Sequence, residues 1–222
     1  MLIERSMHDV WLSNAYVLGD EPGGAAVFVD SGAPLEPLLE FVEEQELTVT
    51  HVLRTHGHTD HVIGEDDLCE RFGVEVATGP VQTGGLDIRA LPTPGHSEDG
   101  VSFVVGEEAC FTGDTLFLDA VGGGDPELVR ASVMDSLMAL PHAMRVLPGH
   151  TEETTIGREW EHNPFVLFWR GVEPSVDEPV HVGGEPATLV VWSPDYDGKG
   201  KALVRFADGR EAIVGGSRVE RG

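Results

Sequence analysis

Four side chains that commonly bind metal ions fall within six residues of this sequence. The stretch Thr55-His56-Gly57-His58-Thr59-Asp60-His61 directly follows Thr48–Leu53, an apolar and partly β-branched run that predicts a strand. Imidazole nitrogens and carboxylate oxygens suit zinc and similar divalent ions. One loop at a strand end cannot easily wrap four ligands around a single ion, so the spacing favours two adjacent ions. Gly57 is expected to help by letting the backbone turn sharply between the ligands.

Three later motifs place a glycine directly before another candidate ligand. They are Pro94-Gly95-His96, Thr112-Gly113-Asp114 and Pro148-Gly149-His150, and each is expected in a turn at a strand end. Alone, each motif is more typical of a surface turn or a helix cap. Five of the ten histidines fall in these motifs and the first cluster, which scattered histidines would rarely do. We therefore predict one metal site made of His56, His58, Asp60, His61, His96, Asp114 and His150.

Short apolar runs separated by turn residues predict a mixed α/β chain. Strands are expected at residues 15–18, 25–29, 48–53, 74–76, 87–91, 101–105, 109–112 and 145–147. Helices are expected from Pro34 through Val42, after the histidine cluster up to Phe72, from Asp125 through Leu140, and over residues 155–168. Gly73 is expected to end the second of these helices.

The composition shifts near Gly171, after which the chain is rich in proline, glycine, valine and acidic residues. Residues 203–206, 207–210 and 211–214 have the pattern of a strand, a turn and a strand. We therefore predict two domains, residues 1–171 and a small β-rich domain over residues 172–222. The tail loosely resembles an SH3- or Tudor-like barrel, and a packing or dimerisation extension is its favoured role, so a homodimer is one expectation.

The chain has a formal net charge of −25. Such a charge repels nucleic acid backbones and anionic membranes, so neither is an expected partner. No apolar run approaches the roughly 20 residues of a membrane span, and the first residues lack the apolar block of a secretory signal. We therefore expect a cytoplasmic protein whose cysteines, Cys69 and Cys110, are reduced and buried.

Taken together, the motifs resemble those of the metallo-β-lactamase superfamily. Thr93-Pro94-Gly95-His96-Ser97 and Phe111-Thr112-Gly113-Asp114-Thr115-Leu116-Phe117 resemble in particular its glyoxalase II-like (hydroxyacylglutathione hydrolase-like) branch. The resemblance covers about residues 1–170. It implies an α/β fold, a four-layer αββα sandwich, with the metals in a groove at the sheet edges.

The resemblance also implies how the ligands are shared between two ions. One ion would be held by His56, His58 and His96, a second by Asp60, His61 and His150, and Asp114 would bridge them. Asp60 and Asp114 are the expected catalytic carboxylates. Asp30 matches a buried family aspartate that orients metal ligands, although a turn residue at a strand end would look alike. The expected cofactors are two divalent ions, zinc first, with iron or manganese as alternatives.

The sequence departs from the glyoxalase II-like pattern in three places. Gly-Asp-Thr-Leu-Phe is commonly followed by Gly-x-Gly-Arg, but Gly123 stands here where the arginine would fall. The helical, glutathione-binding C-terminal region is replaced by the shorter β-rich tail. Glu98 and Asp99 add negative charge beside the expected groove. These departures weaken the expectation of a glutathione thioester without affecting the metal chemistry.

The leading functional hypothesis is a dinuclear-metal hydrolase that cleaves a small-molecule thioester or ester by attack of a metal-bridging hydroxide. No G-x-S-x-G motif indicates a serine nucleophile instead. One alternative on the same fold is a persulfide dioxygenase with a single iron held by His56, His96 and Asp114, and another is a lactonase. A non-catalytic alternative is a metal-stabilised binding protein that acts through the tail.

Overall fold

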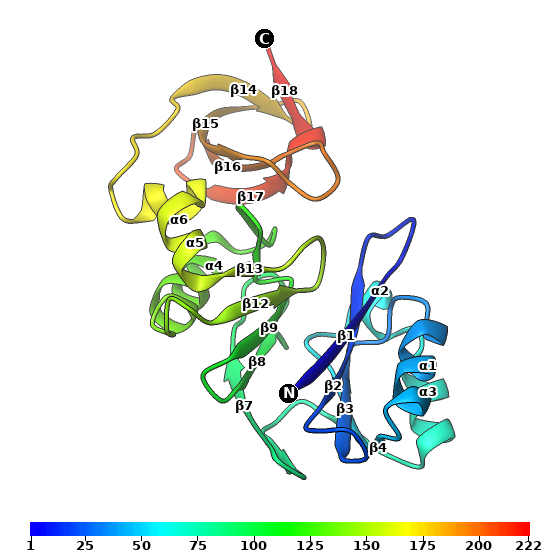
Figure 1. The fold of residues 1–222 in the computed structure, drawn as a ribbon. Coiled ribbons are helices and arrows are strands. Elements are labelled where there is room, and N and C mark those ends of the chain that lie inside the picture. The colour runs from blue at the N-terminus through cyan, green and yellow to red at the C-terminus, as the bar shows by residue number, and fades with distance from the viewer.

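Two β-sheets packed face to face form the body of the molecule, and a third sheet lies at one end of it (Figure 1). The computed structural model describes residues 1–222. The first sheet contains, in spatial order, β1 (Leu2–Met7), β2 (Asn14–Gly19), β3 (Ala25–Val29), β4 (Thr48–Leu53) and β5 (Val76–Ala77). The second contains β13 (Thr154–Thr155), β12 (Arg145–Pro148), β9 (Ala109–Gly113), β8 (Val101–Val105), β7 (Leu86–Pro92) and β6 (Val81–Thr83). A short hairpin joins β10 (Leu116–Phe117) to β11 (Ala120–Val121).

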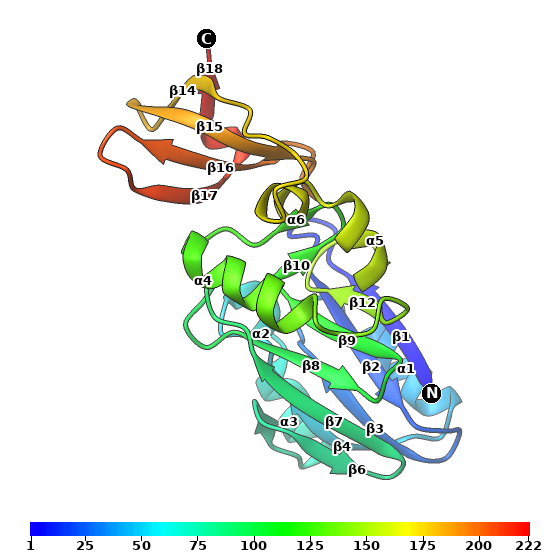
Figure 2. The same ribbon diagram turned by 90° about the vertical axis from the view of Figure 1, so that its left-hand side faces the viewer.

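Helices cover the outer faces of both central sheets (Figure 2). The first sheet is covered by α1 (Glu36–Glu44) and α3 (Glu65–Phe72), with the single turn α2 (Thr59–Val62) before α3. The second is covered by α4 (Pro126–Ala131), which continues as the π-helix η1 (Ser132–Leu137), and by α5 (Ile156–His162) and α6 (Pro164–Trp169). None of the helices combines the length and the apolar character that a membrane crossing requires.

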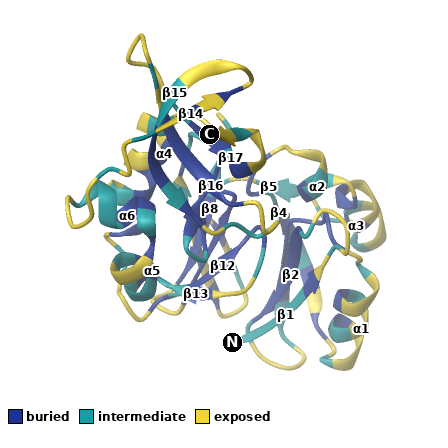
Figure 3. Ribbon diagram, turned by 90° about the horizontal axis from the view of Figure 1, so that it is seen from above, coloured by how far each residue is buried: buried dark blue, intermediate teal, exposed yellow.

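Alternate side chains of the central strands belong to different apolar layers, because successive residues of a strand point to opposite faces. In β3, Val27 and Val29 lie in the core between the sheets, whereas Phe28 packs against α1 and α3. In β8, Phe103 lies between the sheets and Val104 faces the other helices. Both faces of these strands are therefore buried, which explains their continuously apolar sequences (Figure 3). The layers run helix, sheet, sheet, helix, so the predicted αββα sandwich is confirmed.

Two helices that were predicted as continuous are each divided. Gly64 separates α2 from α3 and donates its N–H to the Ser31 carbonyl (3.2 Å), where a Cβ would not fit. Asn163 separates α5 from α6, and its side chain accepts from the first N–H groups of α6. Pro164 follows it, and the residue before a proline favours an extended backbone.

Smaller differences concern the ends of elements. Pro34 lies outside α1, which has Pro37 in its first turn instead. The helix expected to reach Leu140 ends at Leu137, and the strand expected at residues 74–76 is shifted to β5. Strand β1 was not predicted, because it lies at a sheet edge where charged side chains interrupt the apolar pattern. Cys110 is buried as expected, but Cys69 is only partly buried; both are free thiols.

The tail forms a five-stranded antiparallel sheet. Its spatial order is β17 (Glu211–Gly215), β16 (Lys201–Phe206), β15 (Glu185–Ser193), β14 (Glu178–Val182) and β18 (Val219–Arg221), with the 3-10 turn η2 (Gly216–Arg218) before β18. Leu189 and Val204 lie in a small core of its own. Leu203 and Ile213, however, share a core cluster with Phe165 of α6. The division of the chain at residue 171 stays a proposal, because one apolar layer is common to both parts.

Candidate metal centre

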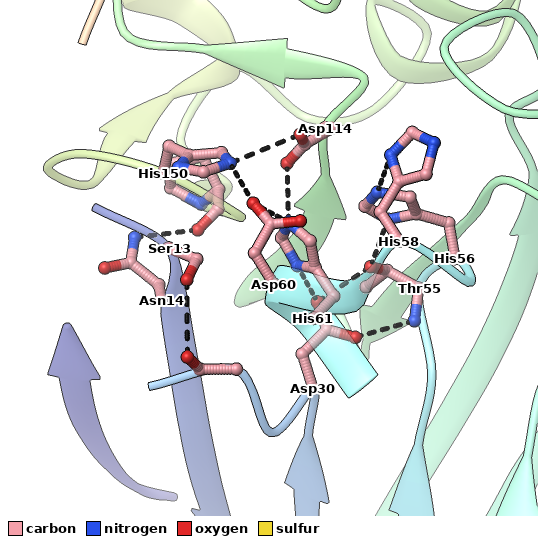
Figure 4. A network of polar contacts seen from close by, with 12 residues as sticks. Ser13, Asn14, Asp30, Thr55, His56, His58, Asp60, His61, Asp114 and His150 are labelled. Atoms are coloured by element: carbon pink, nitrogen blue, oxygen red, sulfur yellow. Dashed lines mark hydrogen bonds and ion pairs between the residues drawn. The ribbon is translucent and has the colours of Figure 1, made fainter. Parts of the chain in front are cut away.

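Every predicted ligand follows the carboxyl end of a strand. Strands β3 and β4 are parallel in the first sheet, and β7, β9 and β12 run in one direction in the second. Those strands are followed in turn by His56, His58, Asp60 and His61 (after β4), His96 (after β7), Asp114 (after β9) and His150 (after β12). The structure brings all seven side chains together where the two sheets meet, and Figure 4 labels all of them except His96.

Three imidazole nitrogens converge at one side of this cluster. His58 Nδ1 lies 3.1 Å from His56 Nε2 and 2.9 Å from His96 Nε2. His56 is buried, His96 is partly buried and His58 is exposed. The three rings therefore lead from the interior of the cluster to its solvent side.

Hydrogen bonds on the far side of two of these rings determine which nitrogen carries the proton. The Thr55 hydroxyl donates to Asp30 Oδ2 (2.7 Å) and therefore accepts from His56 Nδ1–H (3.1 Å). His96 Nδ1–H donates to the Gly123 carbonyl (2.9 Å). In the neutral rings, Nε2 of both His56 and His96 is consequently unprotonated. Two lone pairs thus point at the same place, which is the arrangement that a cation requires.

Asp30 orients a further imidazole from the end of β3. Its Oδ2 accepts from His61 Nδ1–H (2.9 Å), and its Oδ1 accepts from the Thr55 N–H (2.8 Å). Asp30 is buried, and its φ of 57° is a left-handed conformation that aspartate adopts more readily than most residues. Asp30 therefore contacts His61 directly and His56 through Thr55.

The remaining ligands surround Asp114. Its Oδ1 lies 3.3 Å from His61 Nε2, and its Oδ2 lies 3.3 Å from His150 Nε2 and 3.5 Å from His96 Nε2. Asp60 Oδ2 lies 3.6 Å from His150 Nε2 and 3.8 Å from His61 Nε2. Asp114 therefore faces ligands of both predicted sets, whereas Asp60 lies near one set.

Three polar atoms of the cluster are buried without a hydrogen-bond partner. They are His61 Nε2, Asp114 Oδ1 and His150 Nδ1. An unpaired buried polar group costs about 1–3 kcal/mol, so such atoms are rare in folded proteins. The first two lie 3.3 Å apart, so without metal a proton on His61 Nε2 would lie between them, and a divalent cation would take the place of that proton. Imidazole nitrogens and carboxylate oxygens fit zinc, iron or manganese, so the residues present fit the predicted metals.

The charges inside the cluster oppose the effect of burial. Burial alone would raise the pKa of Asp114, but His61 and His150 hold this pKa well below its usual value. Burial alone would lower the pKa of His61, but Asp114 and Asp30 raise it to about 11. Burial lowers the pKa of His56 to about 4. Without metal at pH 7, His61 therefore carries an additional proton whereas His56 presents a lone pair.

Sequence reasoning missed the residues that hold the turn Pro148-Gly149-His150. Asn14 Nδ2 donates to the carbonyls of Pro148 (2.9 Å) and Thr151 (2.8 Å), and the Tyr16 hydroxyl donates to the Pro148 carbonyl (2.7 Å). Both side chains come from β2 of the opposite sheet. The only signal in the sequence was a polar side chain at each of two positions in an otherwise apolar strand.

Glycine is required at a different place from the one expected. A Cβ on Gly149 would lie 2.3 Å from Asp114 Oδ1 and 2.8 Å from His61 Cε1. The backbone of Gly57, in contrast, is not left-handed, and a Cβ there would meet only Asp99 Oδ2, at 3.2 Å. The help expected from Gly57 does not draw on the left-handed freedom of glycine, and α2 begins at Thr59 after His58, an extended N-cap residue.

Comparisons with known proteins connect this geometry to a family. Residues 8–84 match the family model described as the metallo-β-lactamase superfamily. An uncharacterized protein of Mycobacterium tuberculosis is 30% identical, in a match that covers 75% of this chain and 98% of that protein. The hydroxyacylglutathione hydrolase GloC of Haemophilus influenzae is 29% identical over 69% of this chain and 92% of its own.

Three solved structures have the same fold. The B3 metallo-β-lactamase BLEG-1 superposes with a TM-score of 0.69 at 27% identity, over 74% of this chain and 99% of that one. ETHE1 from Myxococcus xanthus superposes with a TM-score of 0.67 at 31% identity, over 74% of this chain and 84% of that one. TTHA1623, solved in a di-iron-bound form, superposes with a TM-score of 0.60 at 30% identity, over 72% of this chain and 98% of that one. With the family model, the relatives and the fold in agreement, the chain belongs to the metallo-β-lactamase superfamily.

Proposed function

We propose that the chain is a metal-dependent hydrolase that cleaves a thioester or ester bond at a two-metal centre. The observation that carries the proposal is the position of Asp114, whose two carboxylate oxygens face His61 on one side and His96 and His150 on the other. The similarity to hydroxyacylglutathione hydrolase GloC and to a protein solved with two irons supports the same reaction class and metal count.

The seven side chains form three overlapping groups, and we divide them between two ions as the family resemblance implies. The ions would be held by His56, His58 and His96 on one side, by Asp60, His61 and His150 on the other, and by Asp114 between them. Two divalent ions bound there would polarise a carbonyl group and lower the pKa of a water molecule toward neutrality. Asp30 and Thr55 would keep the rings of His61 and His56 aimed at the centre.

The cysteine thiols do not provide an alternative nucleophile. Burial raises the pKa of Cys110 to about 12, and burial together with nearby acidic groups raises the pKa of Cys69. The thiolate is the reactive form, so both thiols are inert at neutral pH. Hydrolysis by this chain would therefore depend on the histidine and aspartate cluster.

The surroundings of the cluster favour a neutral acyl substrate over an anionic one. Asp99 lies beside Gly57 at its edge, and the two lysines of the chain are each paired with an aspartate, Lys199 with Asp197 (3.6 Å) and Lys201 with Asp195 (2.9 Å). Asp99 would repel a negatively charged group of the substrate that lay at this edge, away from the ions. We expect neutral thioesters to have a lower KM than glutathione thioesters.

Metal analysis coupled to a substrate screen tests the proposal. The purified chain should contain about two divalent ions per molecule and should hydrolyse at least one of a panel of neutral thioesters, glutathione thioesters, esters and lactones. Asp114→Ala should lose nearly all of this activity, because the carboxylate that faces His61 and His150 of one predicted set and His96 of the other would be gone. Asp87→Ala, an exposed aspartate on β7, is the matched control. Full metal content without turnover would indicate a binding protein instead.

A second candidate is the single-iron persulfide dioxygenase considered from the sequence. The 31% identity to ETHE1 from Myxococcus xanthus favours it, and His56, His96 and Asp114 lie within the same cluster. The two candidates differ in metal content and in oxygen consumption. One iron per chain together with oxygen uptake on a persulfide substrate would replace the hydrolase proposal.

A further inference from the structure

A tyrosine of the C-terminal sheet lies directly on one of the proposed metal ligands. The ring of Tyr196, in the loop between β15 and β16, is stacked on the His150 imidazole with 4.1 Å between the centroids and 6° between the planes. Phe117 approaches both rings edge-on, at 5.8 Å from His150 and 5.6 Å from Tyr196. His150 therefore contacts two aromatic side chains, Tyr196 face to face and Phe117 edge-on, and these two also contact each other.

This contact matters because His150 lacks the support that three other histidines have. His56, His61 and His96 each have an Nδ1 partner on the side away from the centre. His150 Nδ1 is buried and has no hydrogen-bond partner. Ring orientation at His150 must therefore come from packing, and Tyr196 provides the parallel face of that packing.

The loop that carries Tyr196 is itself fixed. Asp195 pairs with Lys201 across the loop at 2.9 Å, with side chains only 3% and 10% exposed. Asp195 also accepts from the Tyr196 N–H (2.9 Å), and Gly198 N–H donates to the Asp195 carbonyl (3.0 Å). A nearly buried ion pair and a tight turn thus hold the tyrosine in one place instead of leaving it on a free loop.

The C-terminal sheet reaches the centre at a second point. Gly124 N–H donates to the Ile213 carbonyl of β17 (3.3 Å), and a Cβ on Gly123 would lie 3.3 Å from the same oxygen. The carbonyl of Gly123 is the partner of His96 Nδ1. At the position where the glyoxalase II-like pattern has arginine, a Cβ would therefore make a tight contact with the backbone of β17.

From these contacts, we propose that the C-terminal sheet completes the metal centre and that Tyr196 is the residue that positions His150. The proposal rests on the metal centre of the proposed function. It assigns the tail a role in ion binding that does not depend on which substrate is cleaved.

Metal titration of the full chain tests this role. Metal-depleted wild type, Tyr196→Phe, Tyr196→Leu and Tyr196→Ala would be titrated with Co²⁺ in competition with a chelator of known affinity. Tyr196→Phe keeps the stacked ring and should match wild type. Tyr196→Leu and Tyr196→Ala should bind their more weakly held Co²⁺ ion with a dissociation constant about tenfold higher. This change corresponds to the upper range of the free energy lost with one aromatic pair. Tyr196→Leu keeps an apolar side chain at this position, so the role of the ring can still be tested if Tyr196→Ala does not fold.

Phe206→Ala is the matched control, because Phe206 is a partly buried aromatic residue of the same sheet that packs on the core of this sheet. It should leave Co²⁺ affinity unchanged. Equal affinities in wild type, Tyr196→Leu and Tyr196→Ala would overturn the proposal, as would a loss in Tyr196→Phe equal to that in Tyr196→Ala. If the affinities change as expected but no carbonyl substrate is cleaved, only the proposed hydrolase function fails.

Discussion

At the scale of single residues, the centre is organised by hydrogen bonds on the outer side of the imidazole rings. Asp30 is the main element of this arrangement, because one carboxylate contacts both His61 and Thr55, and Thr55 in turn contacts His56. Such outer contacts fix the tautomer and the direction of each ring before an ion arrives. The protein therefore does not need to reorganise these two ligands when it binds metal.

Gly149→Ala is expected to abolish activity without unfolding the chain. The added methyl group would lie 2.3 Å from Asp114 Oδ1, so the carboxylate must move away from the ligands that it faces. We expect kcat to fall at least about 100-fold, in line with misplacement of a reacting group by about 1 Å. Activity and circular dichroism would be measured together. Gly79→Ala is the control, since a Cβ there meets nothing within 4 Å, and wild-type activity in Gly149→Ala would contradict the prediction.

Metal affinity should depend on pH through His61. The pKa of His61 is raised to about 11 without metal, so an ion that binds through Nε2 must displace a proton at neutral pH. Apparent affinity for that ion should rise about tenfold per pH unit between pH 7 and 9. Calorimetric titration in two buffers with different ionisation enthalpies would count the proton released. An affinity that does not change over this range would contradict the prediction.

The same shift has a consequence for the metal-free chain. Because the folded state raises the pKa of His61 above its usual value of 6.5, protonation of His61 adds to the free energy of unfolding. This contribution is fully present below pH 6.5 and is lost as the pH rises toward 11. The pKa of His56 is lowered to about 4, so its effect on the free energy of unfolding has the opposite pH dependence. The stability is present above pH 6.5, where His56 is neutral in both states, and is lost as the pH falls toward 4.

At the scale of secondary-structure elements, α5 is tied to the loop beside the centre by one buried carboxylate. Glu159 is fully buried and accepts from Asp119 N–H (2.9 Å), Thr154 Oγ1 (2.6 Å), Arg158 Nη1 (2.9 Å) and Asn163 Nδ2 (2.9 Å). Asp119 belongs to the turn between β10 and β11. The helix therefore fixes the start of the chain segment that later supplies the Gly123 carbonyl to His96.

Glu159→Ala should destabilise the chain by about 3 kcal/mol, because it leaves buried donors without an acceptor. Urea unfolding would measure the loss as a shift of the midpoint at constant slope. Glu161→Ala, on the exposed side of the same helix, should change stability little. A Glu159→Ala variant as stable as Glu161→Ala would show that these contacts contribute no net stability.

Local sequence motifs were enough to predict most strands and the candidate ligands. Contacts between residues far apart in the sequence could not be predicted. The strands around Phe28 and Phe111 were predicted because burial on both faces produces continuous apolar runs. The convergence of the seven candidate ligands was predictable because each follows a strand end in a short motif. The contact of Tyr16 with Pro148 spans 132 positions, and Tyr196 reaches His150 from a different sheet, so no local pattern could indicate either.

At the scale of the whole molecule, the C-terminal sheet and the body share one apolar layer. Val190, Leu203 and Ile213 belong to the largest core cluster together with side chains of α4, α6 and β9. Burial of each such side chain contributes about 1.5–3 kcal/mol. The tail is therefore part of the core rather than an addition to the surface.

A chain that ends at residue 171 should lose its fixed tertiary structure or aggregate, because its apolar layer would be open to solvent. Size-exclusion chromatography and near-ultraviolet circular dichroism would show this. Ile213→Ala is a milder test and should cost about 2–4 kcal/mol, whereas Ile63→Ala, at a side chain 60% exposed, should cost little. A monomeric truncated chain with native spectra would show that the two parts are independent.

The two central sheets contribute different ligands to one centre: the first supplies those from His56 to His61, and the second supplies His96, Asp114 and His150. Each of the three candidate ligand groups combines side chains that follow strands of both sheets. During synthesis, no such group would be complete until the second sheet had formed and docked on the first. A cation bound at this centre would then hold the two sheets together, because its ligands come from both.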